Sequence, residues 1–570
     1  MTTGPGGVTI SGSVLTLEGR KLAELKIIPW QSLIRPPAPG AQIPEVPAGP
    51  HKALACRNSV VSLAFLVTSD WPVFAQVKFT DLKVGSSTIP ADSFRVRLVG
   101  AVTSPEGGTT MEVLEDVDRI SVIRAAAIYV TASIPKGIEA GIYSGKVMVE
   151  VAGHEPCVGD IEIEVADVDL PDVHNWDFFL NVWMNPAPVA RWHKVGMWSD
   201  EHFALLEPYV EDLASHGQKT AVVPICYQPW GTQTRDPFPN AVIWKKRGDE
   251  YEFDFSIFGR YVELHEACGI DRAIHCYSVV SGPGPRRDST IEYVDVATGQ
   301  VEQIETEIGD AEWTRAWRAF LAAFRQYLAG KGWLEKTYIA FDEKPDDVMT
   351  IVMAMLDEFA PDLKIALAAN TRSDTFGRLD DLCLSGVFDD KGIAEVAPAD
   401  RRAMGVAELL DPENVCAITK SCPSKMITTY YVCCGPAFPN TFVFSPLVES
   451  RMLGWLSAQG GYDGFLRWSY NDWPDNPFTH PEYTPFPTGD CHFVYPGDDG
   501  PVGCLRWEQL REGIQDYELV LLAASKLETS EDVVDYEQAI SLACRNPNGR
   551  EKAVGDIELA RRLLMPIAAR

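Results

Sequence analysis

Long apolar runs are missing from this sequence of 570 residues, and no stretch is apolar over enough length to span a bilayer. The first residues also lack the basic and apolar regions of a signal peptide, so we expect neither a membrane anchor nor secretion. Histidine is scarce, and the ten histidines include no pair at the helical spacing that metal sites use. We therefore predict no metal and no cofactor.

Disulfide patterns are missing as well. The 13 cysteines are odd in number and scattered, and they include no CxxC pair. The neighbours Cys433 and Cys434 have poor geometry for a disulfide with each other. We expect a reduced protein of the cytoplasm whose thiols are mostly buried.

Positive charge is in deficit. The net charge is −30 at pH 7, and the isoelectric point is near 4.7. A chain this acidic is repelled by phosphate backbones and by anionic lipid, which argues against nucleic acid and membrane partners. The simplest interpretation of the charge is solubility, and the oligomeric state stays open.

The apolar content, 46%, is ordinary for a globular protein, and the length calls for two or three domains. In residues 1–170, short segments such as 94–99 and 160–165 alternate apolar and polar residues, with Gly, Pro and Ser clusters between them. This pattern predicts an N-terminal β-sandwich. A packing role for it is the simplest expectation, with a carbohydrate-contacting role as the alternative.

From 171 to 490 the pattern changes to strand, loop and helix in alternation. The candidate strands are 177–184, 219–226, 271–277, 336–342, 363–369, 382–388, 426–433 and 463–470. Eight strands alternating with helices predict a (β/α)8 TIM-type barrel. One helix is expected to begin at Pro208 and end at Gly217. The long segments 228–256 and 280–310 are expected on the catalytic face.

Residues 491–570 are predicted to be helical, because Leu510, Ile514, Tyr517 and Leu521 share one helical face. The fold class is therefore multidomain α/β. We predict a β-sandwich over 1–170, a catalytic barrel over 171–490, and a C-terminal helical segment packed on the barrel over 491–570.

One stretch stands out for chemistry. The apolar run that begins at Lys336 ends in two adjacent carboxylates, Asp342 and Glu343, and Pro345 then stops the strand. In a barrel this places both acids at the carboxyl end of the fourth strand, where such folds carry their active sites. The plainer interpretation is that Asp342 caps the next helix and Glu343 is solvated.

The other strand ends carry amides and aromatic rings, with no Ser-His pair and no phosphate-binding loop. This inventory suits a neutral sugar and the protonation of a glycosidic oxygen. Plainer roles are open for each residue: histidine packing, ring packing at the mouth, or helix capping. The candidates are Trp183, Asn185, His275, Tyr277, Asn370, Tyr430, Tyr431, Trp468, Tyr470, Asn471, Trp473 and Asp490.

Several later segments resemble a known family. They are Gly464-Phe-Leu-Arg-Trp-Ser-Tyr-Asn-Asp-Trp-Pro474, Gly489-Asp490, Val494-Tyr-Pro-Gly497 and Leu510-Arg-Glu-Gly-Ile-Gln-Asp-Tyr-Glu518. They are similar to the glycoside-hydrolase-like proteins related to the β-N-acetylgalactosaminidases of glycoside hydrolase family 123. The resemblance covers the barrel and the C-terminal segment, and many members of this superfamily have no assigned activity.

The resemblance implies substrate-assisted retaining hydrolysis of a β-linked N-acetylgalactosamine or N-acetylhexosamine. Glu343 would be the acid and base, and Asp342 would orient the acetamido group of the substrate. It further implies that Tyr431 or Tyr430 contacts the acetamido oxygen. Trp468, Tyr470 and Trp473 would wall the pocket, and Asn471 and Asp490 would bind hydroxyl groups.

Two alternatives remain. One is a retaining or inverting glycosidase of other sugar specificity, in which Glu343 works with a carboxylate from another strand, Asp389 or Asp472. The other is a non-catalytic carbohydrate-binding barrel. Lys344 directly follows the acid pair and would shift the pKa of its carboxyl groups if it turned inward.

Overall fold

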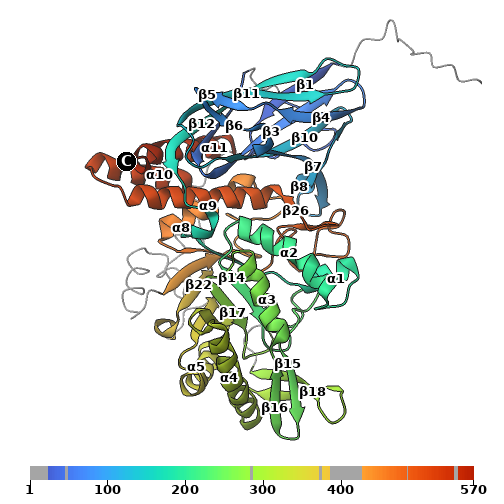
Figure 1. The fold of residues 1–570 in the computed structure, drawn as a ribbon, viewed down its shortest axis with the longest axis vertical. Coiled ribbons are helices and arrows are strands. Elements are labelled where there is room, and N and C mark those ends of the chain that lie inside the picture. The colour runs from blue at the N-terminus through green and yellow to red at the C-terminus, as the bar shows by residue number, and fades with distance from the viewer. Residues whose placement is uncertain are drawn as a thin grey trace, which may run out of the picture.

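The computed structural model describes residues 24–44, 49–282, 287–370, 375–385, 426–483, 485–544 and 550–570. Figure 1 shows three parts stacked along the long axis. A sheet-rich N-terminal region lies at one end, a parallel sheet with its helices at the other, and the C-terminal helices between them. Among the described residues, none of the helices combines the length and the apolar character of a membrane span.

The N-terminal region consists of two sheets that contribute to one apolar core, which includes Phe65 from one sheet and Val147 from the other. The first sheet has the order β1-β3-β10-β7-β8-β26-β25, in which β25 (Tyr495–Pro496) and β26 (Pro501–Cys504) come from the C-terminal part. The second has the order β2-β12-β11-β4-β9 with β5 and β6 beside it. The bounds are β1 Leu25–Trp30, β2 His51–Arg57, β3 Ser59–Ser69, β4 Val73–Phe79, β5 Leu82–Val84, β6 Ser87–Ile89, β7 Phe94–Ser104, β8 Gly108–Asp116, β9 Ile120–Val122, β10 Ala125–Ile134, β11 Gly141–Glu150 and β12 Cys157–Asp169.

The second part contains a barrel-like sheet of eight strands in the order β13-β24-β23-β22-β21-β20-β17-β14, and every neighbouring pair is parallel. The two end strands meet through a bridge between Leu180 and Gln218, next to which the Lys219 N–H donates to the Leu180 carbonyl at 2.9 Å. The bounds are β13 Phe179–Val182, β14 Thr220–Pro224, β17 Ala273–Tyr277, β20 Thr337–Asp342, β21 Lys364–Ala369, β22 Asp381–Ser385, β23 Ile427–Tyr431 and β24 Gly464–Arg467.

All eight predicted strands are present within a few residues of their expected bounds. The alternation with helices is less regular than predicted. Between β21 and β22 the described residues contain only a single turn of 3-10 helix, Phe376–Arg378. The structure therefore supports a barrel-like parallel sheet in which strand and helix do not alternate throughout the described residues.

Helices precede or follow most of the parallel strands. They are α1 Ala187–His193, α2 Asp200–Ser215, α3 Ser256–Ala267, α4 Ala311–Lys331, α5 Asp346–Phe359 and α8 Leu447–Gly460. The prediction that a helix begins at Pro208 is wrong: α2 begins eight residues earlier, and Pro208 lies inside it. Ser199 sets the start, because its side chain accepts a hydrogen bond from the His202 N–H, and two acidic residues follow in the first turn.

The two long segments between strands form a sheet of their own, in the order β16-β15-β18-β19. These strands are β15 Ile243–Arg247, β16 Glu250–Asp254, β18 Asp288–Asp295 and β19 Val301–Glu307. Trp244 from β15 stacks on Phe320 of α4 with ring centroids 5.0 Å apart, which holds this sheet against the helix.

The C-terminal part joins the other two. Its elements are β25 Tyr495–Pro496, β26 Pro501–Cys504, α9 Leu505–Ala524, α10 Ser530–Cys544 and α11 Arg550–Ala568. Strand β26 pairs with β8 of the N-terminal sheet, and Glu518 of α9 accepts a hydrogen bond at 2.9 Å from the Phe178 N–H, which precedes β13. The segment thus packs on both neighbours rather than on the barrel-like sheet alone.

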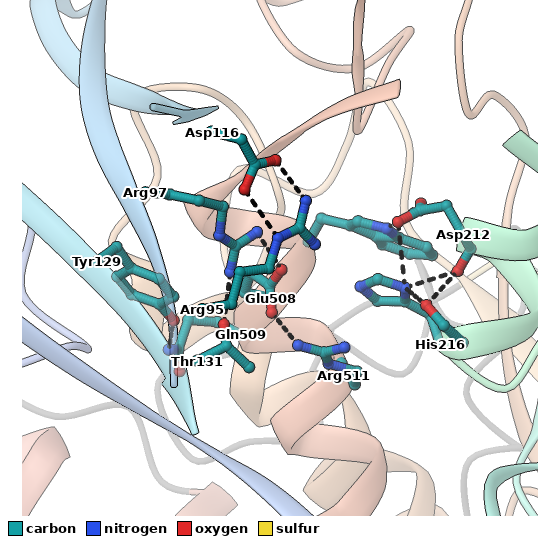
Figure 2. A network of polar contacts seen from close by, with 12 residues as sticks. Arg95, Arg97, Asp116, Tyr129, Thr131, Asp212, His216, Glu508, Gln509 and Arg511 are labelled. Carbon is teal, nitrogen blue, oxygen red and sulfur yellow. Dashed lines mark hydrogen bonds and ion pairs between the residues drawn. The ribbon is translucent and has the colours of Figure 1, made fainter. Parts of the chain in front are cut away.

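Buried residues of opposite charge pair across the contact between α9 and the N-terminal sheet (Figure 2). Arg97 of β7 is almost fully buried, and its guanidinium lies 2.7 Å from a carboxylate oxygen of Glu508. Gln509 donates to the Tyr129 hydroxyl of β10 at 2.7 Å. Burial alone raises the pKa of Glu508, but the charges of Arg511 and Arg97 outweigh it and hold that pKa well below the usual range. These contacts fix the N-terminal region on α9, the helix that also contacts the part with the parallel sheet.

Candidate active site

Strand β20 ends in the acid pair. Asp342 is its last residue, and the Glu343 N–H still donates to the Ala368 carbonyl of β21 at 2.8 Å. The backbone of Glu343 has a φ of +49°, in the left-handed region that residues other than glycine seldom adopt. Neighbours on a regular strand point to opposite faces. Because the chain turns at Glu343, both side chains line the same pocket.

The pocket lies at the carboxyl ends of the parallel strands and has about 560 Å³ of empty volume, part of it open to solvent. Its lining combines three carboxylates with aromatic rings and two thiols. The lining residues are Trp183, Gln233, Asp342, Glu343, Ala368, Tyr431, Cys433, Cys434, Leu466, Trp468, Phe486 and Asp490.

The electrostatic environment of Asp342 favours its protonated form. Burial is the main cause and the charge of Glu343 the second, and together they raise the pKa of Asp342 from 3.8 to about 7. The positive charge of Lys344 opposes this shift. Lys344 is itself buried, and its ammonium group donates to the Gly282 carbonyl at 2.5 Å. Near neutral pH the acid pair is therefore able to hold a proton.

Tyr431 fixes the second acid. It is the last residue of β23, and its hydroxyl donates to Oε1 of Glu343 at 2.7 Å. Burial, followed by the charge of Glu343, raises the pKa of Tyr431 far above its usual value, so the hydroxyl keeps its proton. One carboxylate oxygen of Glu343 is thus occupied by a protein donor.

Asp490 is held from two sides. The buried guanidinium of Arg467 donates to Oδ1 of Asp490 at 2.7 Å, and the indole N–H of Trp468 donates to Oδ2 at 3.1 Å. Arg467 also donates to the Val432 carbonyl at 2.7 Å, which ties the loop after β23 to β24. Burial raises the pKa of Asp490, and the charge of Arg467 opposes that shift. The result is a rigid carboxylate at the wall of the pocket.

Aromatic rings form the rest of the wall. Trp183, which follows β13, packs against Tyr277 and Trp230 with ring centroids 4.8 Å and 4.9 Å apart. On the other side Trp468 packs against Phe486 with centroids 5.0 Å apart. Flat apolar faces beside carboxylates suit the apolar face and the hydroxyl groups of a sugar ring.

Two predicted residues brace the site from behind. The Asn185 N–H donates to Oδ1 of Asn471 at 2.9 Å, and the Asn471 amide donates back to the Asn185 carbonyl at 2.8 Å. Both side chains are fully buried. They join the loop after β13 to the loop after β24, and neither is among the residues that line the pocket.

The structure does not bring His275 to the pocket. It lies two residues before the end of β17 and is buried inside the barrel-like sheet, with Nε2 3.3 Å from a carboxylate oxygen of Asp381. Burial lowers the pKa of His275 to about 3 and raises that of Asp381 to about 8, so both are neutral at pH 7. Two residues along a strand place His275 about 6.6 Å below the strand end.

Three aromatic candidates also face away. The Tyr430 hydroxyl donates to the Leu453 carbonyl of α8 at 2.7 Å, on the opposite face of β23 from Tyr431. The Tyr470 hydroxyl donates to Asp212 at 2.6 Å, and the Trp473 indole donates to the Val494 carbonyl at 2.6 Å. After Trp468 the chain leaves the pocket, so these two rings pack elsewhere.

The remaining candidates have mixed outcomes. Asn370 is exposed after β21 and does not line the pocket. Asp472, one of the two alternative second acids, is fully buried, its two carboxylate oxygens share the Arg235 N–H at 3.1 Å and 3.0 Å, and it is not among the residues that line the pocket. Asp389, the other one, lies outside the described residues.

Some lining residues were not predicted. Gln233 comes from the long segment after β14, and the sequence signal for it was only the length of that segment. Cys433 and Cys434 lie two and three residues after the end of β23, and Phe486 lies in a loop before Asp490. A search for every polar residue within three positions of a strand end would have included the two cysteines. Within the described residues, no group of three or more histidine, cysteine or acidic side chains is arranged to hold a metal ion.

Comparison with known proteins gives two clear results. A family model described as "Glycoside hydrolase 123, catalytic domain" matches residues 183–523. A solved family 123 glycoside hydrolase from Clostridium perfringens, whose structural analysis concerns glycolipid glycan hydrolysis, has 20% sequence identity and a TM-score of 0.80. That match covers 95% of this chain and 98% of the other, and at this identity it shows a shared fold.

A second solved structure is far less similar. It is a Bacteroides ovatus GH5 xyloglucanase in complex with a heptasaccharide, at 9% identity and a TM-score of 0.30, covering 81% of this chain and 98% of the other. A TM-score this low is no evidence of a shared fold. None of the curated protein sequences matches the chain.

Proposed function

The chain belongs to glycoside hydrolase family 123, and from this premise we propose that it releases β-linked N-acetylgalactosamine, or a close N-acetylhexosamine, by substrate-assisted retaining hydrolysis. One observation carries the proposal: Asp342 and Glu343, although adjacent in the chain, line one pocket together. We interpret the barrel-like sheet as a variant of the (β/α)8 barrel, whose active site lies at the carboxyl ends of its strands.

The adjacency of the acids favours assistance by the substrate. In an ordinary retaining glycosidase two carboxyl groups stand on opposite sides of the scissile bond, about 5–5.5 Å apart, and one attacks the sugar. Consecutive residues cannot easily flank a bond in this way. They can divide the work if the 2-acetamido group of the substrate supplies the nucleophile.

In the first step Glu343 gives its proton to the glycosidic oxygen while the acetamido carbonyl oxygen attacks the anomeric carbon. The glycosidic bond breaks, and its electron pair stays on the protonated leaving group. The sugar is left as an oxazolinium-type ring. Because the new bond forms on the face opposite the leaving group, the configuration at the anomeric carbon is inverted once.

In the second step the ionised Glu343 removes a proton from a water molecule, which attacks the anomeric carbon from the face that the leaving group vacated. The ring opens, the acetamido group is regenerated, and Glu343 is protonated again. The second inversion restores the β configuration, so the reaction retains stereochemistry. The Tyr431 hydroxyl holds one oxygen of Glu343 and leaves the other for these proton transfers.

Asp342 is the positioning acid in this scheme. Its ionised form accepts a hydrogen bond from the acetamido N–H and stabilises the positive charge that develops on the amide. In the free enzyme the pKa of Asp342 is raised to about 7. A donor from the substrate favours the ionised form, so substrate binding shifts the proton of the pair toward Glu343, where the first step needs it.

The walls fit a neutral sugar. Trp183 and Trp468 offer aromatic faces, and Asp490 has a second lone pair on each oxygen after Arg467 and Trp468 are satisfied. We assign Asp490 to a sugar hydroxyl. The relative from Clostridium perfringens acts on glycolipid glycans, which makes a terminal N-acetylgalactosamine on such a glycan a reasonable natural substrate. The free thiols of the described cysteines are consistent with work in a reducing cytoplasm.

The test compares two aryl β-galactosides that differ only at carbon 2, one with an acetamido group and one with a hydroxyl. We expect turnover of the first and none of the second, because only the first can supply its own nucleophile. Proton NMR of the fresh product should show the β anomer. Equal turnover of both substrates, or an α product, would contradict the proposed mechanism, and binding without turnover would favour a non-catalytic carbohydrate-binding barrel.

A further inference from the structure

Two neighbouring thiols lie in the wall of the catalytic pocket. Cys433 and Cys434 follow β23 two and three residues after Tyr431, and both line the same pocket as the acid pair. Cys433 is half-buried and Cys434 is exposed. Their sulfur atoms are 3.7 Å apart, so the side chains point toward one another rather than to opposite sides of the chain.

The backbone that carries this thiol pair is held in place. The Cys433 N–H donates to the Gly435 carbonyl at 3.0 Å, and the Asn440 amide donates to the Cys433 carbonyl at 2.8 Å. The buried Arg467 also donates to the carbonyl of Val432. Hydrogen bonds from Asn440 and Arg467 therefore hold the loop that carries the two sulfur atoms. Both sulfurs can bind one ligand with little movement of the backbone.

The two sulfurs, 3.7 Å apart, are close enough to bind one atom together, since two thiolates bound at about 2.3 Å to a single tetrahedral centre lie about 3.8 Å apart. Trivalent arsenic is pyramidal with a narrower S–As–S angle, so the two sulfurs must move slightly closer to bind it. The nearby carboxylate of Asp490 already takes the donors of Arg467 and Trp468, and the described residues offer no group of three metal ligands. The geometry thus favours an occupant that needs only two sulfur ligands over a zinc ion, which needs four.

We propose that Cys433 and Cys434 form a dithiol site for thiophilic ligands that two sulfurs satisfy, represented by monosubstituted trivalent arsenicals, and that an occupant of this site blocks the catalytic pocket. With phenylarsine oxide the reaction is a condensation. The As=O oxygen leaves as water with the two thiol protons, two As–S bonds form, and the oxidation state of arsenic does not change. No oxidant or reductant is required.

The local chemistry suits this reaction. A hydrogen bond from Cys433 is the main cause that lowers the pKa of Cys434 to about 7. A good fraction of Cys434 is therefore thiolate at neutral pH, which is the nucleophilic form. Cys433 keeps its proton as the donor and attacks second, after the first As–S bond has brought arsenic within its reach.

The binding test uses the full-length protein and phenylarsine oxide. Intact-mass spectrometry should show one adduct, lighter by one water than the sum of the parts. An excess of a monothiol should not remove this adduct, whereas 2,3-dimercaptopropanol should, because only a dithiol competes with a two-sulfur site. Cys433→Ser and Cys434→Ser should each lose the monothiol-resistant adduct. Cys268→Ser, which removes a half-buried cysteine of another element, should keep it.

Mapping on the wild-type protein does not depend on how the variants fold. The other accessible cysteines are alkylated while arsenic is bound, the arsenic is removed with the dithiol, and a second label is added. The second label should fall on the peptide that contains residues 433–434. Its absence there, or a resistant adduct that persists in both serine variants, would overturn the proposed site.

Blocking is tested separately and rests on the proposed function. Turnover of the aryl β-N-acetylgalactosaminide should be lost as the adduct forms and should return with 2,3-dimercaptopropanol. A complete adduct with undiminished turnover would overturn the claim that the occupant blocks the pocket. If the protein turns over none of the glycosides tested, the proposed function fails, while the mass and mapping results still decide whether the dithiol site exists.

Discussion

Asp342 and Glu343 are consecutive residues whose carboxyl groups line one pocket, and the left-handed φ of Glu343, +49°, makes this possible. On a regular strand the two side chains would point to opposite faces of the sheet, so one of the two acids would point away from the pocket. Strained backbone of this kind is seldom kept in a non-glycine residue unless the surrounding structure holds it. Here the Glu343 N–H donates to the Ala368 carbonyl, and the Tyr431 hydroxyl donates to the Glu343 carboxylate.

The raised pKa of Asp342 has a consequence for stability. Between about pH 4 and pH 7 the folded protein holds a proton on Asp342 that the unfolded chain has lost. The free energy of unfolding therefore falls as pH rises across this interval, and the loss is complete above the folded-state pKa of about 7. Asp342→Asn should therefore raise the free energy of unfolding by at most about 4 kcal/mol at pH 8, and by less than half as much, at most about 2 kcal/mol, at pH 5.

Urea unfolding of wild type and Asp342→Asn at the two pH values measures this effect. Asp346→Asn is the matched control, since Asp346 is exposed in the first turn of α5 and should change little at either pH. A variant at Asp342 that is less stable than wild type at pH 8 would contradict the assigned shift of its pKa.

Glu343→Gln removes the proton donor while keeping the shape of the side chain. For substrates with a poor leaving group, kcat/KM should fall by about 10²–10⁴-fold, the usual contribution of a general acid. The loss should be much smaller with an activated leaving group such as dinitrophenolate, because that group needs no proton. Steady-state kinetics with both substrates measures the difference, and an equal loss with both would argue against an acid role.

Tyr431→Phe deletes the hydroxyl that donates to Glu343 at 2.7 Å. A hydrogen bond to a charged group contributes about 1.5–3 kcal/mol, so kcat/KM should fall by about 10- to 100-fold. Tyr430→Phe is the matched control, because its hydroxyl donates to the Leu453 carbonyl on the other face of the strand. If both variants have the same kinetics, Tyr431 does not position Glu343.

Arg97→Met tests how the N-terminal region is held on α9. It leaves the buried carboxylate of Glu508 without one of its two cations, which should cost about 3–5 kcal/mol of stability. Arg95→Met on the same strand breaks only the exposed pair with Asp116 and should cost about 0–1 kcal/mol. Thermal unfolding of both variants compares them, and equal effects would show that the buried pair in Figure 2 carries no special weight.

Much of the framework could be predicted from the sequence. Each strand of the parallel sheet is a short apolar run between turn signals, because both of its faces are buried, and all eight runs were found. The acid pair was identified for the same reason, as charge at the end of such a run. The start of α2 was predicted wrongly at Pro208, because proline is common at the first position of a helix. The side-chain cap at Ser199 sets the true start.

The depth and direction of side chains could not be predicted. His275 and Tyr277 stand on one strand two residues apart, yet one is enclosed beside Asp381 and the other packs under the tryptophans of the wall. Tyr430 and Tyr431 are neighbours on opposite faces, and only the register of β23 decides which one reaches Glu343. Cys433 and Cys434 looked like a poor disulfide in sequence, and their place in the pocket depends on the loop tied by Arg467.

The most direct test of the central claim measures whether the acetamido oxygen of the substrate is the nucleophile. Aryl β-N-acetylgalactosaminides whose acetyl methyl group carries zero, one, two or three fluorine atoms differ in the nucleophilicity of that oxygen and little in size. We predict that log kcat/KM of the wild-type enzyme falls steeply and steadily with each fluorine. A rate that is independent of fluorination would contradict the assignment of Asp342 and Glu343 to substrate-assisted hydrolysis.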